Sequence, residues 1–265
     1  MTRPVTLCGS LSRLASPLGR SLHEAGYRAL GLPFTYVPFE VSDLGGAIAG
    51  MRALGIRGFG VSQPFKQQVI PLLDALEPRA ERIGAINTIV NDGGRLVGHN
   101  TDWVGAVRAL EEARAIGGAR VLLVGAGGAA RAIAFGLQAA DARVTIVNRD
   151  HARAERLVAE VGDGAEVAPF ALLGDVDLVR RFEVVVNATS LGQADADGAR
   201  NAIPEAALGE GQLVMDIVYK PVETPLVTLA LARGARVIRG TRMLLHQAAA
   251  QFELYTGMPA PLKAM

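Results

Sequence analysis

The chain has 265 residues, of which 50% are hydrophobic and 20% are charged, and its formal net charge is +1. This composition is typical of a soluble globular protein with one large domain or two modest ones. The near-neutral charge gives no electrostatic reason to expect nucleic acid or membrane partners. The single Cys8 excludes an internal disulfide, and the four histidines show no metal-ligand spacing. We expect a cytoplasmic protein without a metal site, a secretion signal or a membrane-spanning helix.

Apolar runs alternate with helical segments along the chain, which predicts an α/β fold with parallel sheets and helices on both faces. Ile86–Val97 is an exception, because Asn91-Asp-Gly-Gly94 between two apolar runs predicts a hairpin turn. The other strands are expected at Val5–Gly9, Phe34–Val41, Gly58–Val61, Arg120–Val124, Arg143–Val147, Val184–Asn187, Leu213–Ile217 and Arg236–Ile238.

The most informative segment is a buried strand that runs into a glycine turn and then into an Ala-rich helix. Gly125, Gly127 and Ala130 fit the pattern G-x-G-x-x-A. The first glycine permits a tight turn, the second lets the backbone approach a pyrophosphate, and the alanine lets helix and strand pack closely. The helix N-terminus supplies free N–H groups to the anion. In this context the pattern predicts a dinucleotide-binding site.

The end of the next strand indicates which dinucleotide is bound. An acidic residue at that point would accept a hydrogen bond from the ribose 2′-hydroxyl of NAD, but the chain has Asn148 and Arg149, which suit a 2′-phosphate. Arg153 lies nearby, while Asp150 beside Arg149 would weaken a preference for the phosphate. We therefore predict NADP as the cofactor.

The position of the glycine turn implies two domains. A substrate domain, residues 1–103, precedes it, and residues 104–238 form the Rossmann-type cofactor domain. The helix Asp102–Ala115 connects them. Beyond residue 238 one long helix is predicted, Met243–Tyr255; it must bury its apolar face, so we expect residues 239–265 to return to the first domain. A cleft between the two domains is then the expected ligand site.

Several polar side chains lie where a predicted strand ends or a helix begins. Lys66 and Asp102 are the expected catalytic pair, since a lysine can exchange a proton with a substrate hydroxyl and a carboxylate can orient it. Lys66 could instead be a solvated lysine at a helix start, and Asp102 could cap its helix. Asn87, among apolar neighbours, is a turn residue or a buried amide that needs a partner. Gln247 could equally be an exposed helical residue.

Taken together and in order, these motifs resemble the shikimate dehydrogenase family over nearly the whole chain. The segments that carry the resemblance are Val61-Ser-Gln-Pro-Phe-Lys66, Ile86-Asn-Thr88, Asn100-Thr-Asp102, Gly125–Arg131, Asn148-Arg149, Asn187-Ala-Thr-Ser190, Tyr219-Lys-Pro-Val-Glu-Thr-Pro225 and Met243–Ala248.

The resemblance implies a reversible, NADP-dependent oxidation of shikimate to 3-dehydroshikimate in aromatic amino acid biosynthesis, the chorismate pathway, by a monomer or homodimer. It implies Lys66 and Asp102 as catalytic residues. The expected substrate-binding residues are Ser12, Ser16, Ser62, Asn87, Asp102, Tyr219 and Gln247. The expected cofactor-binding residues are Gly125, Ala126, Gly127, Gly128, Ala129, Asn148, Arg149, Arg153, Thr189 and Gly240.

The chain departs from the family pattern in two places. The family motif S-x-S-P-x-x-H, whose serines hold the substrate carboxylate, is altered here: Ser16 precedes proline, position 14 is Leu, and His23 is displaced. Ser12, Ser21 or Arg13 could substitute for the missing serine. Gly60 replaces an asparagine of the family. These departures are typical of a divergent, shikimate-dehydrogenase-like branch, and they leave a quinate- or aminoshikimate-type dehydrogenase, or a dinucleotide-binding protein with little turnover, as alternatives.

Overall fold

The computed structural model describes residues 4–194, 201 and 203–265. The chain divides into two compact units, the first formed by Met1–Val104 with Leu245–Met265 and the second by Gly105–Leu244. Two helices, α5 (Asp102–Glu111) and α10 (Gly240–Thr256), contain residues of both units. The passage back to the first unit falls inside α10, later in the chain than the predicted boundary after residue 238.

The first unit contains a six-stranded sheet of order β2-β1-β3-β5-β6-β4. Pairing is parallel for β1–β2, β1–β3 and β4–β6 but antiparallel for β3–β5 and β5–β6, so this sheet is mixed. Its strands are β1 (Thr6–Ser12), β2 (Phe34–Glu40), β3 (Gly58–Val61), β4 (Ala75–Leu76), β5 (Thr88–Asp92) and β6 (Arg95–His99), and its other helical segments are α1 (Pro17–Ala29), α2 (Leu44–Ala53), α3 (Phe65–Gln68), the 3₁₀ helix η1 (Ile70–Leu72) and α4 (Pro78–Ile83).

The β5–β6 hairpin confirms the predicted turn and explains the antiparallel part of the sheet. Gly93 and Gly94 both have positive φ, 61° and 97°. Two successive residues with positive φ match the right-handed twist of paired strands, and glycine adopts this conformation without strain. The hairpin therefore brings Thr88 at the start of β5 opposite His99 at the end of β6.

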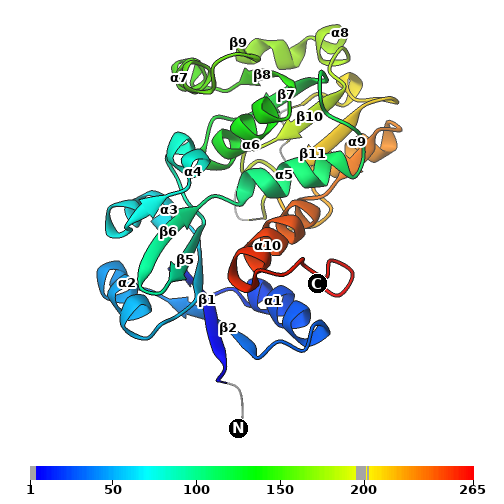
Figure 1. The fold of residues 1–265 in the computed structure, drawn as a ribbon. Coiled ribbons are helices and arrows are strands. Elements are labelled where there is room, and N and C mark those ends of the chain that lie inside the picture. Colours follow the sequence, from blue (N-terminus) through cyan, green and yellow to red (C-terminus); the bar gives the residue numbers. More distant parts are fainter. Residues whose placement is uncertain (1–3, 195–200, 202) are drawn as a thin grey trace. The chain divides into compact units, whose positions relative to one another are not determined.

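The last part of the chain packs against α1 and β3 of the first unit, as Figure 1 shows for α10 and α1. Phe252 of α10 lies against Gly26 of α1, where an added Cβ would be 2.9 Å from the phenyl ring. Tyr255 of α10 lies against Gly58 of β3, where an added Cβ would be 2.2 Å from the ring. Small residues on the first unit thus make room for large side chains of α10.

The second unit is an all-parallel six-stranded sheet of order β12-β11-β10-β7-β8-β9. This is the strand order of the Rossmann fold, with the switch point between β7 and β10. Its strands are β7 (Arg120–Val124), β8 (Arg143–Val147), β9 (Ala165–Ala168), β10 (Val184–Asn187), β11 (Leu213–Asp216) and β12 (Arg236–Ile238), and its helical segments, besides those shared, are α6 (Gly128–Ala139), α7 (His151–Val161), η2 (Phe170–Gly174), α8 (Val176–Val179), η3 (Glu205–Ala207) and α9 (Pro225–Ala232).

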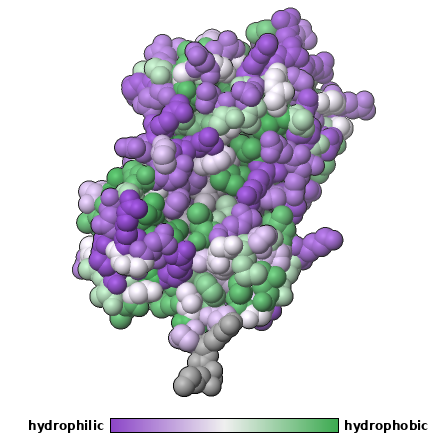
Figure 2. Space-filling view, in the orientation of Figure 1, coloured by the Kyte–Doolittle hydropathy of each residue, from purple (hydrophilic) through white to green (hydrophobic). Residues whose placement is uncertain are grey.

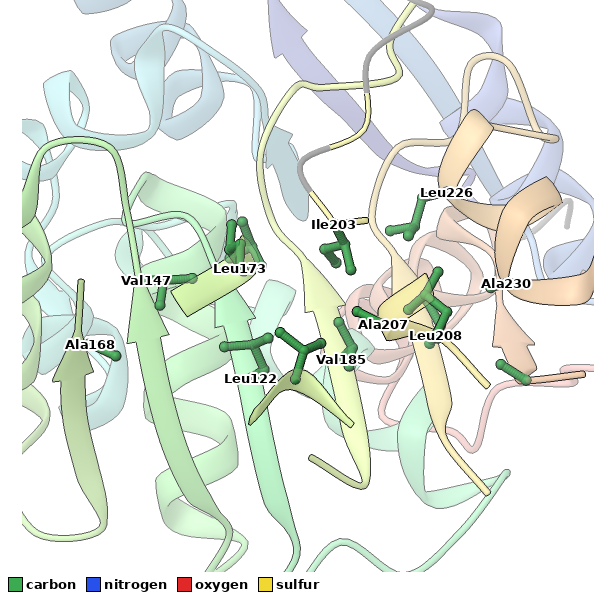
Figure 3. Packing of buried hydrophobic residues seen from close by; sticks show 14 residues of the cluster. Leu122, Val147, Ala168, Leu173, Val185, Ile203, Ala207, Leu208, Leu226 and Ala230 are labelled. Atoms are coloured by element: carbon green, nitrogen blue, oxygen red, sulfur yellow. The ribbon is translucent and has the colours of Figure 1, made fainter. Parts of the chain in front are cut away.

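Both faces of the central strands of this sheet are buried. Leu122, Val147 and Val185 point to one face and meet residues of η2, η3 and α9, including Leu173 and Leu226 (Figure 3). The alternate residues of these strands are buried on the other face, where α6 contributes its own buried apolar side chains. Burial on both faces accounts for the continuous apolar runs seen in the sequence.

The surface contrasts with these interiors. Hydrophilic residues cover most of the visible face of the second unit (Figure 2). Within the described residues, no helix has the length and hydropathy required to cross a membrane.

The predicted strands are present, with shifted ends in some cases. β1 continues past Gly9 to Ser12 because Ser10 and Ser12 pair with β2. α5 ends at Glu111 and not at the predicted Ala115, because the hydrogen bond from Ala113 N–H to Leu110 O spans three residues and not the four of an α-helix. The sequence analysis missed β4 and β9. Both lie at sheet edges, and β4 has only two residues while the sequence of β9, Ala-Glu-Val-Ala, has low strand propensity.

The contact between Gly58 and Tyr255 gives a stability prediction. Gly58→Ala places a methyl group inside the tyrosine ring, so we expect a loss of about 1–3 kcal/mol and a Tm lower by roughly 2–10 °C. Gly50→Ala is the matched control, because nothing lies within 4 Å of its added Cβ and the residue is inside helix α2; it should be neutral or stabilising. Thermal unfolding followed by circular dichroism measures both. Equal Tm values for the two variants would contradict the packing argument.

Candidate active site

Lys66 and Asp102 form an ion pair in the first unit. Lys66 lies in the short helix α3 just after β3, and its carbonyl accepts a hydrogen bond of 2.9 Å from Ile86 N–H. Its Nζ is 2.6 Å from Oδ2 of Asp102, and the two side chains are 21% and 7% exposed. A short, largely buried pair of this kind holds the ammonium in one position while leaving it partly open to solvent. The alternative that Lys66 is merely a solvated lysine is therefore wrong.

The Asp102 carboxylate is bound through both oxygens. Oδ1 accepts a hydrogen bond of 2.9 Å from Asn87 Nδ2, and Oδ2 pairs with Lys66. The backbone N–H of Asp102 donates to Asn100 Oδ1 at 3.0 Å. Among the described residues the carboxylate accepts from these two side chains and from no N–H of α5, so it does not cap the helix. Its place is instead fixed for contact with Lys66.

The amide of Asn87, buried at 1% exposure, has partners on both sides. Its Nδ2 donates to Asp102 and, at 3.0 Å, to Thr101 Oγ1. Its Oδ1 accepts from Thr101 N–H at 2.7 Å and from Thr88 Oγ1 at 2.9 Å. The partner that a buried amide requires is thus supplied by the protein itself.

A second buried amide, that of Gln251 on α10, lies behind Asn87. Its Nε2 donates to Asn87 O at 3.1 Å and to Thr88 Oγ1 at 3.0 Å. Its Oε1 is 3.4 Å from Nε2 of His23. The imidazole of His23 stacks on Tyr36, with ring centroids 4.4 Å apart and planes 4° apart. Burial lowers the pKa of His23 to about 4, so the ring is neutral at pH 7.

In the second unit, the glycine turn after β7 has the geometry that the fingerprint predicts. Gly125 has φ of 117°, and an added Cβ would lie 2.9 Å from Ala188 O. Gly127 is open, with nothing within 4 Å of its added Cβ, and it precedes α6 without a side-chain cap. The first N–H groups of α6 are therefore available to an anion approaching the open face of Gly127.

The end of β8 exposes two arginines. Arg149 and Arg153 are exposed, and neither guanidinium has a hydrogen bond or ion pair with another described residue. The Asp150 carboxylate caps α7 by accepting from Arg153 N–H at 3.1 Å, and Asn148 Nδ2 donates to Asp150 O. Asp150 is thus committed to the helix, while both cations are available to a phosphate.

A buried carboxylate, Asp216 at the end of β11, organises the loops next to the glycine turn. It accepts from Asn187 Nδ2 at 2.9 Å, from Val218 N–H at 3.1 Å and from Thr224 Oγ1 at 2.5 Å. Thr189, one of the predicted cofactor residues, donates its hydroxyl to Asn187 Oδ1 at 2.7 Å. Burial raises the pKa of Asp216. These bonds fix the loops after β10 and β11, at the edge where ligands bind in such sheets.

Known proteins are similar to this chain in sequence. The shikimate dehydrogenase (NADP(+)) of Geobacillus kaustophilus is 44% identical over 91% of this chain and 88% of its own. That of Pyrococcus furiosus is 40% identical over 95% of this chain and 92% of its own. The chain belongs to the shikimate dehydrogenase family.

Family models and solved structures agree with this assignment. The shikimate dehydrogenase substrate-binding domain matches residues 12–89, the shikimate / quinate 5-dehydrogenase model residues 108–219, and the C-terminal domain model residues 240–265. Shikimate 5-dehydrogenase from Listeria monocytogenes, solved with shikimate and NAD, superposes with a TM-score of 0.91 at 32% identity and covers 99% of this chain and 96% of its own. Quinate dehydrogenase from Corynebacterium glutamicum, solved with NAD, gives 0.89 at 30% identity, with 98% and 97% covered.

The loop that departs from the family pattern uses two of its serines internally. The Ser12 hydroxyl donates to Leu14 O at 2.8 Å, and the Ser21 hydroxyl donates to Pro17 O at 3.2 Å. Ser16 instead caps α1 by accepting from Leu18 N–H, so its own proton is available. Arg13 is exposed. Of the groups proposed to hold a substrate carboxylate in this shikimate dehydrogenase family member, Ser16 and Arg13 keep a donor, whereas Ser12 and Ser21 do not.

The remaining predicted residues have the following positions. Ser62 is exposed between β3 and α3, and Tyr219 is 40% exposed in the second unit. Gln247 is half-buried on α10, without a hydrogen bond to another described residue. It lies one turn before Gln251, hence on the same helix face. Gly240 begins α10 where an added Cβ would be 2.5 Å from Ile217 O, so the close approach requires glycine.

Sequence reasoning missed Gln251, His23 and Asp216 as parts of the two sites. At Gly60, an added Cβ would be 3.0 Å from the Tyr36 hydroxyl and 3.3 Å from Gln251 Nε2. The space left by the family's asparagine is therefore bordered by these two groups. Thr224 and Asn187 were identified only as parts of segments that match the family. Asp216, which accepts hydrogen bonds from both, belongs to no sequence motif.

The buried His23 predicts a pH-dependent stability. Between pH 6.5 and 4 the unfolded chain binds a proton at this position that the folded protein cannot, so stability falls as pH falls through this window, by up to about 3 kcal/mol. The groups facing the ring are Gln251, the neutral Tyr27, Tyr36 and Tyr255, and the Glu24 carboxylate, which opposes the shift.

His23→Phe keeps the aromatic stacking and removes the titration. Urea unfolding at pH 7, 5.5 and 4.5 should show the wild type losing its advantage over the variant as the pH falls. A free-energy difference between the two proteins that stays constant over this range would contradict a buried neutral His23.

Proposed function

We propose that this protein is an NADP-dependent dehydrogenase that interconverts shikimate, or a close cyclic hydroxy acid, and its 3-keto form. The observation that carries the proposal is the ion pair of Lys66 and Asp102, fixed by Asn87, in a member of the shikimate dehydrogenase family. The proposed location is the cytoplasm, where the single buried Cys8 stays reduced.

The proposed chemistry in the first unit is proton transfer at a substrate hydroxyl. In the oxidation, the Lys66 amine accepts the hydroxyl proton while a hydride leaves the same carbon, and a C=O double bond forms. In the reduction, the Lys66 ammonium returns the proton to the oxygen. Asp102, 2.6 Å away, orients Nζ. Asn87, Gln247 and Ser62 are the proposed contacts to other substrate hydroxyls, and Ser16 to the carboxylate.

The second unit fits a phosphorylated dinucleotide. The open Gly127, the uncapped N-terminus of α6 and the available Arg149 and Arg153 match a pyrophosphate and a 2′-phosphate. When bound, NADP supplies the hydride acceptor. We propose that the cofactor contacts lie at Gly125–Ala129, with Thr189 on a neighbouring loop and Gly240 at the start of α10, and that Tyr219 contacts the substrate.

A quinate- or aminoshikimate-type dehydrogenase is the second candidate. The altered loop favours it. The hydroxyls of Ser12 and Ser21 donate to backbone carbonyls, so fewer hydroxyls can donate to the substrate carboxylate than in the family motif. A dinucleotide-binding protein without turnover would need only the second unit, whereas the first unit retains the complete Lys66–Asp102–Asn87 arrangement.

The experiment that tests the function is a panel of shikimate, quinate and aminoshikimate with NADP and with NAD, followed by the absorbance of the reduced nicotinamide. Turnover of shikimate with NADP supports the proposal, and preference for another acid of the panel selects the second candidate. No turnover of any acid with either cofactor would refute both.

Lys66→Ala should lower kcat on the preferred substrate by on the order of 10²–10⁴, because the proton then has no positioned acceptor. The affinity for NADP should change little, since Lys66 is outside the glycine turn. Lys263→Ala, an exposed lysine of the first unit, is the control and should keep normal activity. Steady-state kinetics with all three proteins measure the effect, and a near-normal kcat in Lys66→Ala would remove Lys66 from the mechanism.

Arg149→Ser should weaken NADP binding by roughly tenfold to a hundredfold, the effect of one charge-assisted phosphate contact of about 1.5–3 kcal/mol, and should leave NAD binding almost unchanged. Arg143→Ser, at the opposite end of β8, is the control for the loss of a positive charge. Fluorescence titration with both cofactors gives the ratio of the two affinities. If that ratio is the same in the wild type and in Arg149→Ser, another residue reads the phosphate.

A further inference from the structure

A directed series of hydrogen bonds joins a buried histidine to the Lys66–Asp102 pair. Gln251 links His23 to Thr88: its Oε1 lies 3.4 Å from His23 Nε2 and its Nε2 donates to Thr88 Oγ1 at 3.0 Å. Thr88 Oγ1 donates to Asn87 Oδ1 at 2.9 Å. Asn87 Nδ2 then donates at 2.9 Å to the Asp102 oxygen that Lys66 does not bind. From Gln251 onward, every residue of the series donates a hydrogen bond to the next residue toward Asp102.

The Asp102 end of the series fixes this sense. A carboxylate only accepts, so Asn87 must turn its NH₂ group toward Asp102 and its oxygen toward Thr88. The Thr88 hydroxyl then donates its only hydrogen to Asn87 Oδ1, so toward Gln251 it can only accept. Gln251 must present its NH₂ group to Thr88 and its oxygen to His23. The neutral His23 completes the series by carrying its proton on Nε2, while Nδ1 is buried without a hydrogen-bond partner among the described residues.

The orientation of Gln251 is supported by a further contact. Its Nε2 also donates to the backbone carbonyl of Asn87 at 3.1 Å, so one amide holds both the main chain and, through Thr88, the side chain of the residue that positions Asp102. Gln251 is 4% exposed. A turned amide would place its oxygen against the Asn87 carbonyl and the Thr88 hydroxyl oxygen, and neither of these two acceptors would then receive a hydrogen bond from Gln251.

We propose that Gln251 is a positioning residue of the dehydrogenase reaction, which acts through Thr88 and Asn87 to hold Asp102, and with it Lys66, in the reactive arrangement. This inference rests on the proposed function of Lys66 and Asp102. His23 completes the series, since its Nε2 lies 3.4 Å from the Gln251 oxygen. Gln251 touches neither Lys66 nor Asp102; it acts on Asn87 through the backbone carbonyl of that residue and through the Thr88 hydroxyl.

Three variants and one control test the proposal in the full-length protein. Gln251→Glu keeps the shape but only accepts when ionised, Gln251→Leu removes the polar group, and Thr88→Val removes the linking hydroxyl from the other side. Ile48→Ala is the matched control, since Ile48 of α2 is 3% exposed, against 4% for Gln251, and has no hydrogen bond or ring contact with a residue of the series. The measurements are kcat, KM for substrate and for NADP, and Tm, with the preferred acid of the panel.

We expect each of the three variants to lower kcat by roughly tenfold with the KM for NADP within about twofold of the wild type. The Gln251→Leu, Thr88→Val double variant should be little slower than either single variant, because both break one series. Ile48→Ala should lower Tm, because it removes buried apolar volume, and should keep kcat. A structural role alone would make kcat follow Tm in all four proteins.

Wild-type kcat in folded Gln251→Glu and Thr88→Val, together with a large loss in Lys66→Ala, would overturn this inference and leave the proposed function intact. Normal kcat in Lys66→Ala would overturn the proposed function itself, and the inference with it. If the Gln251 variants do not fold, Thr88→Val decides, because its substitution conserves shape and lies outside α10.

Discussion

The active-site geometry of the first unit depends on one buried side chain, the amide of Asn87. It joins the start of β5, through Thr88, to the start of α5, through Thr101 and Asp102. Gln251 of α10 adds a third segment, because it donates to the backbone carbonyl of Asn87 and to the Thr88 hydroxyl. An amide has a donor end and an acceptor end. Here Nδ2 faces the Asp102 carboxylate, which can only accept, and Oδ1 faces the Thr101 N–H, which can only donate, so only the present orientation satisfies both. A single asymmetric group thus converts the packing of three elements into a defined position for the Asp102 carboxylate.

In the second unit a buried carboxylate, that of Asp216, holds the neighbouring loops in place. Asp216 accepts hydrogen bonds from Asn187, Val218 and Thr224, so the loops that follow two neighbouring strands are tied at one point. An acceptor-only group can gather several donors without any choice of orientation. In both units the rigid centre is a buried polar residue whose bonds are satisfied by the protein, which keeps the surrounding loops in place for a ligand.

Much of this arrangement could be predicted from the sequence because the relevant patterns are local. The glycine turn at Gly125, the hairpin at Gly93-Gly94 and the strand-end position of Lys66 depend on neighbouring residues. Gln251 could not be found in this way, since its partner Asn87 is 164 residues distant in the chain and a helical glutamine has no distinguishing pattern. The hydrogen bonds of Ser12 and Ser21 could not be predicted either, because they depend on which backbone carbonyl each hydroxyl meets in the folded chain.

The packing of α10 on β3 has a consequence for the order in which the protein is made. Gly58 and Gly60 lie on one face of their strand, and Tyr255 and Gln251 cover them from the end of the chain. The second unit is continuous in sequence and can complete its sheet as soon as its own residues leave the ribosome. The first unit begins earlier but must wait for the last segment to be synthesised. During translation the glycine face of β3 therefore stays uncovered until α10 has been synthesised.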